Sequence, residues 1–115
     1  MNKNQSVVIQ VNSDGMGVAD KELKTTLIKN YFKLLNSENQ IPFAIVFYAS
    51  GVNFVCTGSE IIEDLKIIES KGVKILACKT CLNFYNIADK VETGIIATMI
   101  DIIDIQFSVE KIINL

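Results

Sequence analysis

The apolar run FAIVFYA at residues 43–49 decides the fold of this chain. A short continuous run of this kind is typical of a strand that is covered on both faces, as in a parallel sheet. VKILAC at residues 73–78 has the same character. SVVIQV at residues 6–11 is rich in β-branched residues and ends at the turn-rich NSDGMG. These runs predict three buried strands.

Helical patterns separate the strand patterns. In residues 20–35 apolar side chains recur at helical spacing, and Asp20 is the predicted N-cap. The segment 57–72 predicts a second helix, with Thr57 and Glu60 at the spacing of a capping box. SGVNFVC, which precedes this helix, is predicted to be a loop.

The last part of the chain adds two helices and one strand. TCLNFYNI at residues 80–87 predicts a short helix capped by Thr80, and TMIDIIDIQF at 98–107 predicts another. VEKIINL closes the chain as a strand. The alternation predicts one α/β domain over residues 1–115, with three α/β/α layers around a mostly parallel sheet of about five strands.

Composition excludes several functional classes. The 115 residues carry a net charge of −2, and all eleven basic residues are lysines. Without arginine or a basic cluster, nucleic acid is not an expected partner. No signal peptide and no run of 18 apolar residues is found, so we expect a cytoplasmic protein without a membrane span. The lack of histidine excludes Ser-His-Asp and Cys-His pairs within the chain. We expect no cofactor.

Two of the three cysteines, Cys78 and Cys81, stand where the third strand ends and a helix begins. A helix N-terminus and nearby Lys79 favour a thiolate, so we expect a lowered pKa and a sulfur nucleophile at Cys81. Both residues can also be small hydrophobic packing groups. A zinc site would need ligands from Cys56 or a second chain, and no metal is expected. A thioredoxin-type redox pair normally follows the first strand, which disfavours that interpretation.

Polar and glycine residues follow the first two strands at the same predicted edge of the sheet, where α/β proteins bind ligands. Asp14 and its neighbours can form a small pocket beside the cysteines, or the glycines can serve only turns and close backbone contacts. SDGMG lacks the third glycine of a dinucleotide fingerprint. The candidate substrate-binding residues are Asp14, Gly15, Gly17, Ser50 and Gly51.

The helix at 98–107 is apolar nearly all round. Met99, Ile102, Ile103 and Phe107 form one stripe, and Ile100 and Ile105 widen it. Such a helix is usually buried on two sides, and in a small domain the second side can be another subunit. We therefore expect a homo-oligomer.

Three stretches carry a resemblance to a known family: SDGMG, the SGV…TGSE segment, and CKTCLNFY after KGVKIL. With them the chain resembles the DsrE-like family, and is similar to the carboxyl-terminal domain of YedF-type proteins of selenium metabolism. The resemblance implies a three-layer α/β/α fold, an oligomer, and a sulfurtransferase-like role in which Cys81 carries a persulfide and Cys78 is its neighbouring thiol. The implied partner is a TusA-like sulfur carrier or another sulfur donor or acceptor protein, since we expect no TusA-like domain at the amino terminus of this chain.

Two functional hypotheses follow. In the first, Cys81 receives sulfane sulfur and passes it to a partner protein, with Cys78 as a second acceptor or as the thiol that releases the sulfur. In the second, the protein is a non-catalytic small-ligand-binding or assembly module with the same fold.

Overall fold

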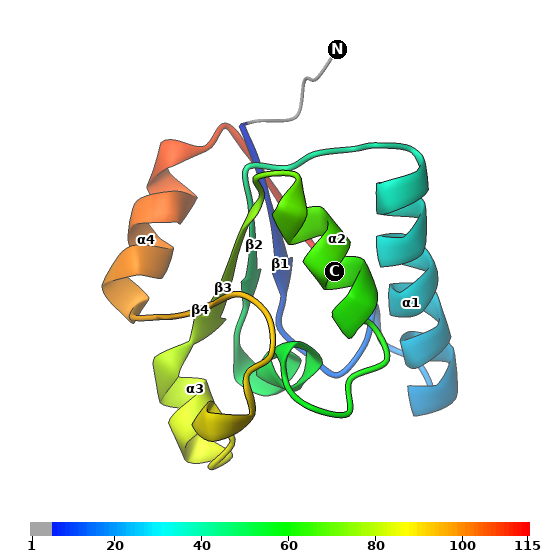
Figure 1. Ribbon diagram of the computed structural model, residues 1–115, viewed down its shortest axis with the longest axis horizontal. Coiled ribbons are helices and arrows are strands. Elements are labelled where there is room, and N and C mark those ends of the chain that lie inside the picture. Colours follow the sequence, from blue (N-terminus) through cyan, green and yellow to red (C-terminus); the bar gives the residue numbers. More distant parts are fainter. Residues whose placement is uncertain (1–5) are drawn as a thin grey trace.

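The computed structural model describes residues 6–115, in which strands and helices alternate along the chain (Figure 1). Five parallel strands form one sheet in the order β4-β3-β2-β1-β5 within these residues. The strands are β1 (Val7–Val11), β2 (Ala44–Phe47), β3 (Lys74–Cys78), β4 (Ile95–Ala97) and β5 (Lys111–Asn114). The predicted α/β class is confirmed, with a sheet that is parallel at every pairing.

Helices cover both faces of the sheet. The α-helices are α1 (Lys21–Ser37), α2 (Ile62–Ser70), α3 (Lys79–Phe84) and α4 (Met99–Ser108). The short 3-10 helices are η1 (Ala49–Val55) and η2 (Ala88–Lys90). Figure 1 shows α1 and α2 on one face and α4 on the other.

The handedness of the connections explains this placement. From β1 the chain advances through β2 to β3 in one direction, and from β4 it returns across the sheet to β5. Crossovers between parallel strands are right-handed, so connections that run in opposite directions place their helices on opposite faces. Because all the strands are parallel, their carboxyl ends meet at one edge of the sheet, near α3 and η1 (Figure 1).

The strands predicted from apolar runs form the centre of the core. All four residues of β2 are fully buried, as are Phe32 of α1 and Leu65 of α2. Phe32 packs against Phe47 with ring centroids 6.3 Å apart. A strand with buried side chains on both faces needs an unbroken apolar run, which is the pattern that FAIVFYA shows.

The predicted capping box of the second helix is wrong. The second helix begins at Ile62, and neither Thr57 nor Glu60 caps it. The Thr57 hydroxyl donates to Glu92 at 2.7 Å, and the Glu60 carboxylate pairs with Lys29 of α1 at 2.7 Å. Both side chains have partners that are distant in sequence, and a local pattern could not reveal them.

The segment around Cys78 and Cys81 also differs from the prediction. Helix α3 begins at Lys79, and the N-cap position is held by Cys78 rather than Thr80. The predicted loop 50–56 is largely the 3-10 helix η1. Asp20 does stand at the N-cap of α1, but its side chain makes no capping hydrogen bond within residues 6–115.

Helix α4 is well anchored at its start and exposed along its length. The Thr98 hydroxyl accepts a hydrogen bond from the Asp101 N–H, and the Asp101 carboxylate accepts one from the Thr98 N–H, which is a capping box. Ile102 is buried, whereas Ile100 is 71% exposed and Phe107 is 87% exposed. The predicted stripe is therefore only partly buried within this chain. Among residues 6–115 no helix has the length and apolar character to cross a membrane.

Candidate functional site

The Cys81 sulfur faces the loop that follows β2. Cys81 lies in the first turn of α3, and its Sγ accepts a hydrogen bond from the backbone N–H of Ala49 at 3.1 Å. Ala49 has φ of +51°, a left-handed conformation that non-glycine residues seldom adopt. The backbone at Ala49 is thus held in an uncommon conformation in which its N–H points at a thiol sulfur.

Contacts with β1 fix this turn of the backbone. The Tyr48 N–H donates to the Val11 carbonyl at 3.1 Å, and the Gly51 N–H donates to the Tyr48 carbonyl at 3.0 Å. A Cβ atom at Gly51 would lie 2.3 Å from the Val11 carbonyl oxygen, so only glycine permits this approach. Gly51, a predicted substrate-binding residue, therefore has a structural role: it seats η1 against β1.

Opposing effects act on the Cys81 thiol. Burial raises the pKa of Cys81, the Cys78 thiol beside it raises this pKa further, and the Ala49 N–H opposes both. The net pKa lies above the ordinary value, so the expectation of a lowered pKa is wrong. The physical reason is desolvation, which penalises a thiolate more than one backbone donor stabilises it.

Cys78 and Cys81 come together as predicted. Cys78 ends β3 and is 1% exposed, whereas Cys81 is partly exposed. Their thiols are close enough for Cys78 to influence the pKa of Cys81. This arrangement places one accessible and one buried thiol three residues apart.

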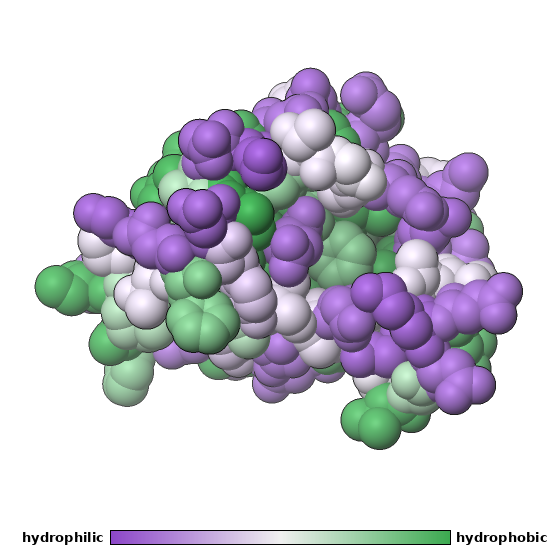
Figure 2. Space-filling model, turned by 90° about the horizontal axis from the view of Figure 1, so that it is seen from below, coloured by the Kyte–Doolittle hydropathy of each residue, from purple (hydrophilic) through white to green (hydrophobic). Residues whose placement is uncertain are grey.

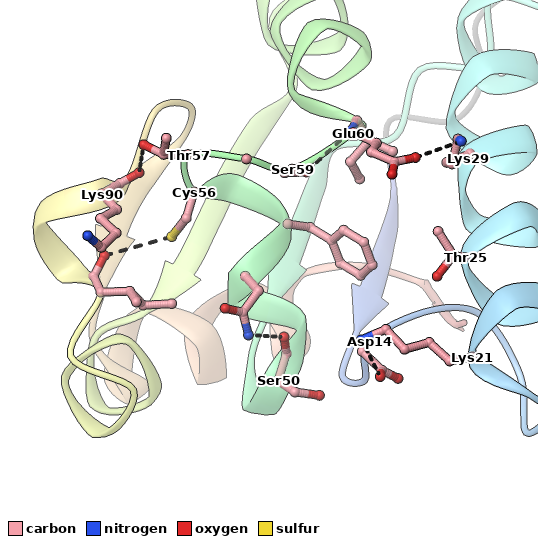
Figure 3. Close-up of a pocket in the computed structure, with 15 residues that line it drawn as sticks. Asp14, Lys21, Thr25, Lys29, Ser50, Cys56, Thr57, Ser59, Glu60 and Lys90 are labelled. Atoms are coloured by element: carbon pink, nitrogen blue, oxygen red, sulfur yellow. Dashed lines mark hydrogen bonds and ion pairs between the residues drawn. The ribbon is translucent and has the colours of Figure 1, made fainter.

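A cavity of about 340 Å³ opens on the other side of η1, at the same edge of the sheet. Figure 3 shows side chains from α1, from the loop after β1, and from residues 50–61 around it. In Figure 2, which looks onto this edge, a hollow with a hydrophobic floor is bordered by hydrophilic side chains. Its lining includes Asp14, Thr25, Ser50, Phe54, Cys56 and Lys90. Neither Cys78 nor Cys81 belongs to the lining.

The predicted pocket residues do not lie together beside Cys81. Asp14 and Ser50 line the cavity together with Cys56, and not a pocket beside Cys81. The Asp14 carboxylate is 2.7 Å from the Lys24 ammonium and 3.4 Å from that of Lys21. The hydrogen bond from Lys24 is the main reason why the pKa of Asp14 is lowered. Asp14 is thus held by lysines of α1.

The two glycines of SDGMG have structural roles here. A Cβ at Gly15 would lie 2.4 Å from the Lys24 Cβ, so glycine allows the loop to pack on α1. Gly17 has φ of +81°, which glycine adopts at little cost. Neither glycine lines the cavity.

Cys56 is held in a different way from Cys81. It is 4% exposed, and its single S–H faces two carbonyl acceptors, that of Val52 at 3.5 Å and that of Ile87 at 3.8 Å. Burial raises the pKa of Cys56, and the negative charges of Asp89 and Glu92 raise it further. The positive charge of Lys90 opposes these effects, but the net pKa stays above the ordinary value, so the neutral thiol is favoured.

The sequence did not reveal the residues that shape the surroundings of Cys81 and the cavity. Ala49 carries no signal in its residue type, because its left-handed conformation follows from the contacts of its neighbours with β1. Lys90 and Phe54 line the cavity, but neither was among the predicted site residues. Among residues 6–115 no group of three or more histidine, cysteine or acidic side chains is placed to hold a metal ion.

Comparison with solved structures gives the same fold. The chain is similar to the YchN protein of E. coli, with 20% identity and a TM-score of 0.70 over 96% of this chain and 99% of that one. It is also similar to MTH1491 of Methanobacterium thermoautotrophicum, a protein of unknown function, with 20% identity and a TM-score of 0.71 over 97% of this chain and 100% of that one.

A third similar structure is BT1422 of Bacteroides thetaiotaomicron, a conserved protein of unknown function. It shares 15% identity at a TM-score of 0.65, over 96% of this chain and 95% of that one. No match was found among curated proteins. Residues 5–115 match the sequence pattern of the DsrE/DsrF-like family. With a match over nearly its whole length, the chain belongs to the DsrE/DsrF-like family.

Proposed function

We propose that the protein carries sulfane sulfur as a persulfide on Cys81 and passes it to a partner protein. The observation that carries this proposal is the hydrogen bond from the Ala49 N–H to the Cys81 sulfur, at a thiol that solvent can reach. A backbone donor aimed at sulfur stabilises the anionic form of a thiol or a persulfide. Resemblance to the sulfur-relay members of the DsrE-like family supports the same role.

Loading is a sulfur transfer between two thiols. The Cys81 thiolate attacks the outer sulfur of a donor persulfide, a new S–S bond forms at Cys81, and the donor leaves as a thiolate. Because the pKa of Cys81 is raised, the thiolate is a minor species at neutral pH and grows as the pH rises. The chain has no histidine to accept the Cys81 proton.

Delivery can follow two routes. A partner thiolate attacks the outer sulfur and leaves with it, which restores Cys81 as a thiolate. Alternatively, the Cys78 thiolate attacks the inner sulfur, so that a Cys78–Cys81 disulfide forms and HS⁻ leaves. The second route requires a thiol reductant to restore the pair. Burial of Cys78 disfavours access by partner proteins and confines it to this internal role.

The test is persulfide loading followed by intact mass. Reduced wild-type protein, Cys78→Ser and Cys81→Ser are incubated with a small-molecule persulfide, and Cys56→Ser is the matched control. We expect a gain of one sulfur atom in every protein except Cys81→Ser. If Cys81→Ser gains sulfur as the wild type does, Cys81 is not the carrier. If no folded, reduced protein gains sulfur, the alternative of a non-catalytic binding or assembly module replaces the relay.

We further propose that the protein assembles with copies of itself through β4 and α4. Their exposed apolar side chains lie close together in the chain and the fold: Ile95, Ile96, Met99, Ile100, Ile103 and Phe107. An apolar surface of this kind usually marks an interface. The molar mass measured by light scattering should be a multiple of 12.8 kDa, and the Ile100→Asp variant should have a lower molar mass. A monomer at every concentration would contradict this.

A TusA-like carrier stays the proposed sulfur partner.

A further inference from the structure

The cavity beside η1 has the properties of a small-molecule site. Its volume of about 340 Å³ is within the range of metabolite pockets. It lies at the carboxyl end of the parallel sheet, between the loop after β1, η1 and α1 (Figure 3). Ligands of open α/β sheets bind at this end.

The lining has one cation that no carboxylate neutralises. Lys29 pairs with Glu60, and Lys21 pairs with Asp14. The Lys90 ammonium has no ion-pair partner among residues 6–115. A ligand with a negative charge would therefore find an available cation at this wall without breaking an ion pair.

Hydroxyl groups with unused hydrogen-bonding capacity lie farther along the cavity, and Figure 3 shows Thr25 at the opposite end from Lys90. Within the described part of the chain, the hydroxyls of Thr25 and Ser50 have no hydrogen-bond partner, and both residues line the cavity. Thr25 comes from α1 and Ser50 from η1, so the two hydroxyls reach the cavity from different elements.

The floor is apolar. Phe54, Ile61 and Ile87 contribute side chains to the lining, and Ile61 is almost fully buried. An apolar floor with a few polar groups at its border favours a ligand that has a hydrophobic body and a polar end. A bare inorganic ion would leave this floor uncovered.

We propose that this cavity binds a small organic anion, with its hydrophobic body on Phe54, Ile61 and Ile87 and its carboxylate or phosphate at Lys90. The hydroxyls of Thr25 and Ser50 lie away from Lys90 (Figure 3), so they would bond to a second polar group at the far end of a longer ligand. This site is separate from the Cys81 thiol and does not depend on the proposed sulfur transfer, because neither Cys78 nor Cys81 lines it.

The test is a titration of ¹⁵N-labelled protein with phenyl phosphate, followed by amide chemical shifts. We expect saturable shifts at Ser50, Phe54, Thr57 and Lys90, with a Kd in the range of about 0.1–1 mM for so small a probe. Inorganic phosphate has only the anionic group and phenol has only the aromatic ring. Each should bind at least about ten-fold more weakly than phenyl phosphate. Benzoate in place of phenyl phosphate distinguishes a carboxylate site from a phosphate site.

Two pairs of variants make the result specific. Lys90→Ala should weaken phenyl phosphate binding about five- to ten-fold, whereas Lys66→Ala, an exposed and equally unpaired lysine on α2, should not. Thr25→Phe should fill the cavity and abolish binding, whereas Thr26→Phe on the solvent side of α1 should not.

Three results would overturn the proposal. They are the absence of saturable shifts at the lining residues up to about 10 mM probe, equal binding of inorganic phosphate, and equal weakening by Lys66→Ala. Since Lys90 is exposed, its variant keeps the fold and decides the question even if Thr25→Phe does not fold. Persulfide loading of Cys81 is unaffected by any of these outcomes, so the two proposals fail separately.

Discussion

Cys81 and Cys56 lie at opposite ends of η1 and show how the same side chain can be held for different purposes. The Cys81 sulfur accepts a hydrogen bond from the Ala49 N–H at the start of η1. The single S–H of Cys56, just after η1, faces two carbonyl acceptors. Burial raises the pKa of both thiols.

The direction of the hydrogen bond separates the two cysteines. A donor aimed at sulfur favours the anion, whereas carbonyl acceptors require the S–H proton to stay. Solvent access adds to the difference, because Cys81 is partly exposed and Cys56 is buried. The environment around Cys81 therefore suits sulfur chemistry, and the environment around Cys56 suits a packing role at the cavity wall.

The largest expected effect is on alkylation rates. At pH 8 iodoacetamide should modify Cys81 at least about 100-fold faster than Cys56, because Cys56 reacts only after a local opening that costs about 3 kcal/mol or more. Peptide mapping after timed quenching measures both rates in one sample. Equal rates would show that η1 opens freely and would remove the distinction between the two thiols.

Gly51→Ala should disturb the segment that separates the two sites. The added Cβ would meet the Val11 carbonyl oxygen, and we expect the free energy of unfolding to fall by about 2–3 kcal/mol. Gly58→Ala is the control, because Gly58 has φ of +93° but open space around it, and should cost only about 1 kcal/mol. Urea unfolding gives both values. A smaller loss for Gly51→Ala than for Gly58→Ala would contradict the seating of η1 on β1.

Ala49→Gly should keep the donor to Cys81 while relieving the left-handed backbone. Glycine adopts φ of +51° without the Cβ penalty, and we expect stabilisation of about 0.5–1 kcal/mol. The alkylation rate of Cys81 should be unchanged, because the N–H remains. A destabilised variant would show that the Ala49 side chain contributes packing that outweighs the strain.

The smallest effect concerns pH. A thiol whose pKa is raised in the folded state stays protonated there after it has ionised in the unfolded state, so its contribution to stability is full at low pH and is lost as pH rises through the folded pKa. The stability difference between wild type and Cys56→Ser should therefore shrink as the pH rises above 9. Urea unfolding at pH 7 and at pH 10 measures this change. A growing difference would mean that Cys56 is held as a thiolate.

The sequence was sufficient to predict the architecture but only part of the site. Unbroken apolar runs such as residues 43–49 identify buried parallel strands, because few other elements bury both faces over so short a length. Parallel strands bring their carboxyl ends to one edge, which is why Cys78 and Cys81 could be placed at the same edge as the segment that follows β2.

The details of the site depend on contacts between distant segments. The caps proposed at Thr57 and Thr80 were wrong, because Thr57 bonds to Glu92 and the strand β3 runs directly into α3. The raised pKa of Cys81 reflects burial, which a helix-start pattern does not reveal. The separation of the cavity from Cys81 follows from η1, a segment whose sequence indicated only a loop.

The most direct test of the central claim is to locate the sulfur in wild-type protein after persulfide loading. Cleavage after lysine places Cys56, Cys78 and Cys81 on three different peptides, since Lys79 lies between the last two. After trapping with iodoacetamide, we expect the additional sulfur atom on the Cys81 peptide, residues 80–90, and none on the Cys56 peptide, residues 34–66. Sulfur on the Cys56 peptide, or equally on all three, would contradict the account.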